Sequence, residues 1–173
     1  MNLKNNTKKR FHFCTKEFLK ELQEKSIIYA DNRETNDRNK YAYDYIFFKE
    51  KKINNGNGMF FLWKDYNCKG NNIKLNDNPS DGEFVLLELN IPSNICIDTD
   101  YDNWCSFIMD LDEADGNYDI ANEICLEYGI KDGLEGSYKC IYDIDDNSRI
   151  QTLIPYFDIN WISNIKYTNI KVI

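Results

Sequence analysis

Residues 84–91, FVLLELNI, constrain the fold more than any other segment of the chain, and Pro92 follows them directly. The segment is apolar and rich in residues that favour strands, and proline cannot take part in the hydrogen bonding of a strand interior. We therefore expect a strand at 84–91. The run MFFLW at 59–63 predicts a second, buried strand. Residues 64–83, between the two, have the Gly, Asn, Asp and Pro content of a long loop.

Helical patterns alternate with the expected strands. Thr15 can cap a helix whose apolar face includes Phe18, Leu19 and Leu22 at helical spacing. Further helices are expected at 41–48, where Tyr41, Tyr45 and Phe48 share a face, after the aspartates at 98–102, at 118–128 before Gly129, and at 137–142 with Ser137 as its cap. Short strands are expected at 27–29, 95–97, 149–154 and 164–173.

This order of elements, with helices segregated from strands, predicts an α+β fold. The 173 residues suit a single globular domain, for which we expect residues 11–173. A chain of this length can bury about 70% of its unfolded surface without staples. The expected architecture is a small mixed or antiparallel sheet with three to five helices packed on it. Residues 1–10 form a basic flexible tail in this reading.

The net charge of −8 bears on the partners. Nucleic acids and anionic membranes are bound mainly through Lys and Arg, so we expect neither as a partner. The first ten residues, MNLKNNTKKR, are the exception with four cations and no acid, and they are more typical of a solvated tail than of a nucleic-acid-binding arm. No run reaches the roughly 20 apolar residues of a membrane helix, and no signal-peptide pattern opens the chain. We expect a cytoplasmic protein, and the abundance of Asn, Lys, Ile and Tyr suggests an AT-rich bacterial genome.

Cysteine usage argues against a structural metal. The six cysteines are Cys14, Cys68, Cys96, Cys105, Cys125 and Cys140. No CxxC motif occurs and His12 is the only histidine, so a zinc site built from clustered Cys and His is not expected. In a cytoplasmic chain we expect reduced thiols, mostly as small core residues. We predict no cofactor.

The segment ICIDTDYDNW at 95–104 raises the main chemical question, because Asp98, Asp100 and Asp102 alternate along it. They match positions one, three and five of a helix–loop–helix calcium loop. However, Asn103 and Met109 replace the glycine and the bidentate glutamate that such a loop needs. The DTD sequence also resembles the nucleophile motif of haloacid-dehalogenase-type phosphatases, but those enzymes begin with the motif and need a doubly wound sheet after it.

A structural role explains the same residues more simply. Thr99, Asp100 and Asp102 stand where side-chain oxygens accept hydrogen bonds from the free N–H groups of a helix. Acidic residues in the first turn also favour the helix dipole. Trp104 would anchor that turn. We therefore interpret the aspartates as helix-capping residues without a metal ion.

Five stretches of the sequence resemble a bacterial family known as domain of unknown function 3841. They are AYDYI (42–46), FLW (61–63), VLLELNIP (85–92), TDYDNW (99–104) and SYKCIYDI (137–144). The family prefers Ser where Thr99 stands and often has His where this chain has Cys105. Its aromatic pair in the first strand is loosely echoed by Phe11 and Phe13. The resemblance implies a small intracellular bacterial protein and brings no established reaction.

Several of these residues could line a binding site. Trp104 and Tyr101 would form the apolar wall of a pocket, and Thr99, Asp100 and the helix N-terminus its polar end, as in many small-ligand sites. The aspartates oppose an anion, so we expect a neutral or cationic partner. The full candidate set is His12, Tyr43, Trp63, Thr99, Asp100, Tyr101, Asp102, Trp104 and Gln151. For Gln151, a buried amide whose hydrogen bonds are satisfied is the simpler interpretation. For Trp63 and Trp104, the simpler interpretation is a position in the core.

Two functions from different classes remain open. The first is a metal-free domain that binds a small molecule or a protein partner, since no complete catalytic constellation is present. The second is an NAD-dependent transferase, because RFHFCTKEFLKEL (10–22) resembles the first strand and helix of ADP-ribosyltransferases. That resemblance implies that His12 holds the nicotinamide ribose, that Tyr43 stacks on the ring and that a late glutamate is catalytic. The closing strands present Gln151 and no Glu.

Overall fold

The α+β class is confirmed by a computed structural model that describes residues 6–30, 37–49, 58–65, 73–76 and 84–172. The chain divides into two compact units. We call residues 1–29, 60–97 and 152–173 the sheet unit, and residues 30–59 and 98–151 the helical unit. Each unit is assembled from distant parts of the sequence.

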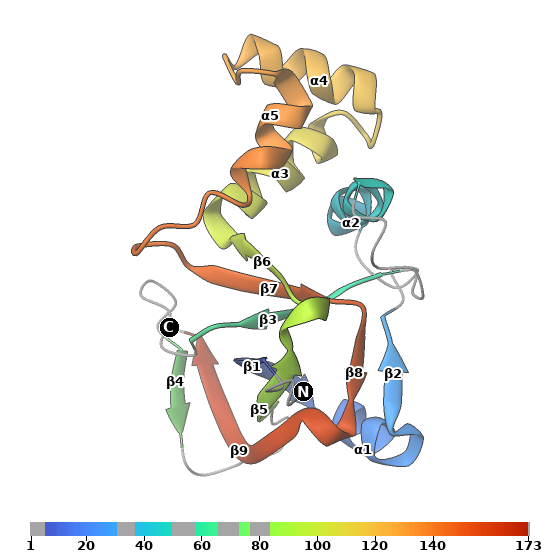
Figure 1. Cartoon of the computed structure of the whole chain (residues 1–173), viewed down its shortest axis with the longest axis vertical. Helices are drawn as coiled ribbons and strands as arrows, with labels where there is room; N and C mark the ends of the chain where they lie inside the picture. Colours follow the sequence, from blue (N-terminus) through green and yellow to red (C-terminus); the bar gives the residue numbers. More distant parts are fainter. Residues whose placement is uncertain (1–5, 31–36, 50–57, 66–72, 77–83, 173) are drawn as a thin grey trace, which may run out of the picture. The chain divides into compact units, whose positions relative to one another are not determined.

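Antiparallel pairing dominates the main sheet (Figure 1). Its strands are β1 (Thr7–Thr15), β3 (Phe60–Trp63), β4 (Ile73–Asn76), β5 (Phe84–Pro92), β6 (Ile97–Asp100), β7 (Ile150–Ile154) and β9 (Ile162–Val172), in the order β4-β9-β5-β1-β3-β7-β6. The expected strand at 84–91 is the central β5, which pairs with β1 along its whole length and with β9 on its other side. A second sheet joins β2 (Ile27–Tyr29) to β8 (Tyr156–Asp158).

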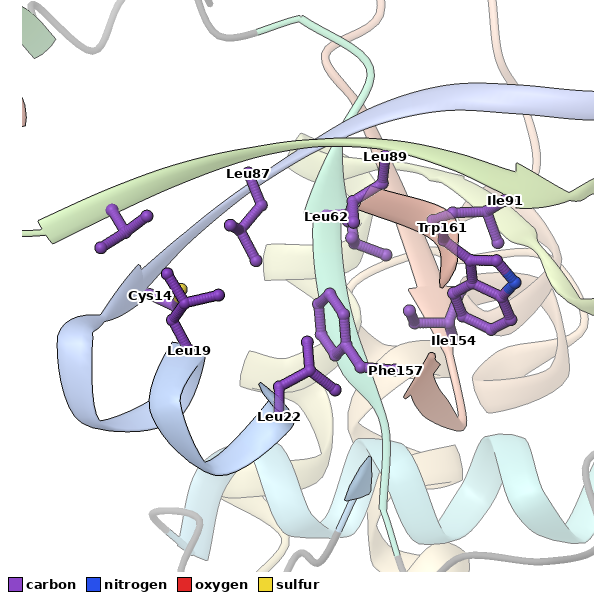
Figure 2. Packing of buried hydrophobic residues seen from close by; sticks show 11 residues of the cluster. Cys14, Leu19, Leu22, Leu62, Leu87, Leu89, Ile91, Ile154, Phe157 and Trp161 are labelled. Atoms are coloured by element: carbon purple, nitrogen blue, oxygen red, sulfur yellow. The ribbon is translucent and has the colours of Figure 1, made fainter. Parts of the chain in front are cut away.

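The core of the sheet unit lies between one face of the sheet and helix α1 (Lys16–Lys25). Alternate residues of β5 point into it, namely Val85, Leu87, Leu89 and Ile91, together with Cys14, Leu19, Leu22, Leu62, Ile154, Phe157 and Trp161. Figure 2 shows these side chains gathered in one cluster. The helix is positioned by its predicted cap, because the Thr15 hydroxyl accepts a hydrogen bond from Phe18 N at 3.1 Å.

The opposite face of the sheet holds a charged residue in the middle of β5. Glu88 lies between the ammonium groups of Lys9, at 3.0 Å, and Lys166, at 2.9 Å. Hydrogen bonds from these two lysines lower the pKa of Glu88 to about 2. The alternation of apolar residues and Glu88 therefore agrees with the period of a strand.

The helical unit contains α2 (Asp37–Lys49), α3 (Tyr101–Glu113), α4 (Tyr118–Glu127) and α5 (Gly133–Cys140). Phe107 is fully buried at its centre, and its ring lies 5.5 Å from that of Tyr45, 6.0 Å from that of Tyr138 and 6.1 Å from that of Trp104. Figure 1 shows α3, α4 and α5 packed together. As expected, α4 ends before Gly129, whose φ of 78° suits glycine.

Three expectations about local structure need correction. Strand β1 begins at Thr7, so the basic segment is not a tail through residue 10; its buried Arg10 donates to Thr152 Oγ1 at 2.5 Å. Strand β4 lies within the expected loop at 64–83 and pairs with β9. Ser137 lies inside α5 and does not cap it. Its hydroxyl instead donates to the buried Asp110 carboxylate at 2.5 Å.

Boundaries near the aspartates also differ. The expected strand at 95–97 is a 3-10 turn at Ser93–Ile95, followed by β6. Between β7 and β9, where no helix or strand was expected, the chain forms the short strand β8 and then a second 3-10 turn, Ile159–Trp161. Cys68, residues 1–5 and the side chain of Phe48 lie outside the described part of the structure.

Candidate functional site

Asp100 is the capping residue at the start of α3. Its Oδ1 accepts a hydrogen bond from Asn103 N at 2.9 Å, and its own backbone N donates to Ile141 O at 2.7 Å. The side chain is 7% exposed, so little of it can reach a ligand. Thr99 does not act as a cap, because its hydroxyl donates to Gln151 O at 3.4 Å. The capping interpretation is confirmed for Asp100 and is wrong for Thr99.

Asp102 has a different role in the first turn of α3. Two guanidinium nitrogens of Arg149 bond to its two carboxylate oxygens. The guanidinium carbon also lies 4.7 Å from the ring centroid of Tyr101. Asp98 lies in β6, before the cap. Within the described ranges no group of three or more His, Cys, Asp or Glu residues is arranged to hold a metal ion.

Replacing Asp100 by Ala should destabilise the helical unit by about 1–2 kcal/mol, because the Asn103 N–H would lose its partner at a buried helix start. Urea unfolding monitored by circular dichroism measures this change. Asp102→Ala provides the comparison: it removes an exposed ion pair and should cost less than about 1 kcal/mol. Equal losses in both variants would contradict the capping role.

Most of the expected pocket residues of the helical unit are buried. Trp104 and Tyr43 are 2% and 3% exposed, and their ring centroids are 5.5 Å apart. Burial raises the pKa of the Tyr43 hydroxyl to about 12. Thr99 and Gln151 are also buried. These side chains therefore belong to the core of the unit. Of the expected set in this unit, only Tyr101 and Asp102 retain accessible surface.

His12 and Trp63 belong to the sheet unit. The Nδ1 atom of His12 lies 3.0 Å from Phe61 O, so Nδ1 carries the proton of the neutral ring. Burial lowers the His12 pKa to about 4 and outweighs the opposing effect of that hydrogen bond. The half-buried Trp63 lies beside Phe61, with ring centroids 6.4 Å apart. The NAD-dependent alternative stays a prediction.

The two units differ strongly in net charge. The sheet unit has 12 Lys and Arg against 9 Asp and Glu, a net of +3, whereas the helical unit has 9 against 20, a net of −11. Residues 101–130 contain eight Asp and Glu and no Lys or Arg. The acidity of the chain is therefore a property of the helical unit, and especially of α3 and α4.

The same helices expose apolar side chains. Ile120 and Leu126 on α4 are 46% and 53% exposed, Tyr128 just after it is 66% exposed, and Met109 on α3 is 69% exposed. We define the acidic apolar face as Met109, Glu113, Asp119, Ile120, Glu123, Leu126, Glu127 and Tyr128. The Tyr128 hydroxyl lies within 3.3 Å of both Glu113 carboxylate oxygens, which connects α3 to the end of α4.

This face was not predicted from the sequence, because the sequence alone does not show which side of α4 is buried. Ala121 and Cys125 are buried and define the inner side of α4. At helical spacing, Ile120 and Leu126 must then flank an outer row that contains Asp119, Glu123 and Glu127. An amphipathic helix with aliphatic residues beside its acidic row indicates a surface that can bury apolar groups of a partner.

A comparison with protein-family models, curated proteins and solved structures finds no match to this chain. The resemblance to domain of unknown function 3841 therefore stays a prediction. None of the described helices is long and apolar enough to cross a bilayer.

Proposed function

We propose that the helical unit is a metal-free docking module for a protein partner that carries basic and apolar side chains. The observation that carries this proposal is the coincidence of exposed Ile120, Leu126, Tyr128 and Met109 with a unit of net charge −11. Large apolar side chains on an exposed surface are a common mark of a protein–protein contact.

Charge selects the kind of partner. A surface rich in carboxylates attracts cationic partners and repels acidic ones, and it speeds association at low ionic strength. Aliphatic side chains between the carboxylates supply the apolar area whose burial stabilises the complex, at about 25 cal/mol per Å². An amphipathic helix with Lys or Arg beside Leu or Ile satisfies both requirements.

A designed peptide tests this function. The probe is an amphipathic helix of Leu and Lys, about 18 residues long, and its matched control replaces every Lys by Glu. We expect the Lys peptide to bind and its dissociation constant to rise about tenfold between low salt and 0.3 M NaCl, because salt screens the carboxylates. Fluorescence anisotropy of the labelled peptide measures both.

Variants locate the binding surface. The double variant Ile120→Ser, Leu126→Ser should weaken binding of the Lys peptide about tenfold or more, because it removes two aliphatic contacts. The control double variant Tyr29→Ser, Tyr167→Ser changes residues of the sheet unit that are 50% and 51% exposed, and should bind as the wild type does. Equal weakening by both, or equal binding of the Glu peptide, would refute the proposal.

A further inference from the structure

One arrangement recurs in the structure: an aromatic ring, a carboxylate and a cation that touches both. Lys9 lies 5.2 Å from the Phe11 ring centroid and 3.0 Å from Glu88. Arg149 lies over the Tyr101 ring and pairs with Asp102. Lys49 lies 5.4 Å from the Tyr45 ring centroid and 2.5 Å from Glu135. A ring face attracts a cation, and an adjacent carboxylate adds an ion pair.

The Tyr45 example gives the detailed pattern. The Tyr45 hydroxyl donates to Glu135 Oε2 at 3.4 Å. This hydrogen bond holds the carboxylate beside the ring and does not involve the cation. Lys49 then completes the group by contacting both, and its ion pair lowers the pKa of Glu135.

Tyr128 and Glu113 form the same pair of an aromatic ring and a carboxylate, joined by a hydrogen bond from the tyrosine hydroxyl. The Tyr128 hydroxyl lies 3.2 Å and 3.3 Å from the two Glu113 oxygens, which fixes the ring beside the carboxylate. Tyr128 is 66% exposed. Glu113 raises the Tyr128 pKa, and Asp110 and Glu127 act in the same direction, so the local field is negative. Within the described ranges no Lys or Arg is found paired with Glu113.

We propose that the Tyr128–Glu113 pair is a receptor for one arginine side chain of the protein partner, whose guanidinium stacks on the Tyr128 ring and pairs with Glu113. The proposal rests on the docking function above and names the residue type that this corner of the acidic apolar face recognises. Arginine fits better than lysine, because its planar guanidinium can stack on a ring while its N–H groups bond to a carboxylate. The exposed Met109 lies one helical turn before Glu113 and can contact the aliphatic part of the arginine.

Nuclear magnetic resonance of tyrosine rings tests the receptor without any partner protein. The probe is ethylguanidinium chloride, titrated into the full chain with ¹³C-labelled tyrosine, against sodium chloride at matched ionic strength. We expect a saturable shift of the Tyr128 ring signals. The rings of Tyr45 and Tyr101 should not respond, because Lys49 and Arg149 already occupy them.

Two variants sharpen the result. Glu113→Gln should weaken ethylguanidinium binding roughly threefold to fivefold, as expected for one exposed charge pair. Glu123→Gln changes a carboxylate of the same face that has no ring contact, and should leave the Tyr128 shift unchanged. Equal shifts of all exposed tyrosines, or a Tyr128 shift that Glu113→Gln does not reduce, would overturn the receptor.

The test also separates the receptor from the docking function. If the Leu and Lys peptide binds in a salt-dependent way while Tyr128 ignores ethylguanidinium, docking stands and the receptor is refuted. If ethylguanidinium binds at Tyr128 but the Leu and Lys peptide does not bind, the Tyr128–Glu113 pair attracts guanidinium while the docking function is refuted, and the receptor as proposed is refuted with it.

Discussion

Phe107→Ala is expected to destabilise the helical unit by about 3–5 kcal/mol. The ring is fully buried and touches three other aromatic rings, those of Tyr45, Trp104 and Tyr138. Truncation to Ala removes apolar contacts from helices α2, α3 and α5 at once and leaves a cavity, which adds to the loss. The measurement is the free energy of unfolding from urea titration, followed by helical circular dichroism.

Met109→Ala is the matched control for this variant. Met109 lies on the same helix but is 69% exposed, so its truncation should change stability by no more than about 0.5 kcal/mol. A loss below about 1 kcal/mol for Phe107→Ala would show that the aromatic cluster is not the core of the helical unit. Equal losses of unfolding free energy in the two variants would lead to the same conclusion.

Stability should fall by about 2–3 kcal/mol between pH 6.5 and pH 4 because of His12. Its pKa is about 4 in the folded chain against 6.5 when unfolded, so within this window the unfolded state binds the proton more readily. The stabilisation is complete above pH 6.5 and is lost as the pH falls towards 4. The full shift in the His12 pKa corresponds to about 3 kcal/mol of unfolding free energy. We expect about 2–3 kcal/mol, because the ring is only half-buried and solvent screens part of the effect.

His12→Phe isolates this effect. Phenylalanine keeps an aromatic ring beside Phe18 and Phe157, whose centroids lie 5.9 Å and 4.8 Å from that of His12, but it cannot titrate. The difference in unfolding free energy between wild type and variant should therefore change with pH over this window. Glu88 does not interfere, because its pKa is lowered from 4.5 to about 2 and its contribution is lost mainly below pH 4.5. Parallel stability curves would contradict the burial of His12.

Local signals in the sequence predicted the elements that depend on neighbouring residues. The cap at Thr15 needs only the N–H group of Phe18, three residues later. Strand β5 follows from an apolar run and a proline. The helix after the aspartates follows from Asp100 and Asn103. In each case the physical cause lies within a few residues, so the pattern is visible without knowledge of the fold.

Partners distant in sequence account for the errors. Ser137 resembles a cap, but its hydroxyl bonds to Asp110, 27 residues earlier. The basic residues before Phe11 resemble a tail, but Lys9 pairs with Glu88 and Arg10 bonds to Thr152. Strand β4 has no strong local pattern and is defined by its pairing with β9. Such partners are set by topology, which local patterns do not contain.

At the candidate site, too, local features were predicted correctly and features set by the fold were not. Sequence spacing placed Asp100 and Trp104 at one helix start, which is correct, but it could not show that the fold buries both. It also averaged the charge over the whole chain, although the helical unit alone carries a net of −11. Only the buried side of α4, marked by Ala121 and Cys125, reveals which of its apolar residues remain exposed.

The most direct test maps where a basic amphipathic helix binds along the chain. Backbone amide signals of the ¹⁵N-labelled protein are recorded while the Leu and Lys peptide is added. We predict that the largest changes fall on Asp119–Tyr128 and on the outer residues of α3 near Met109 and Glu113. Changes centred instead on Thr99–Trp104, or confined to the sheet unit, would contradict it.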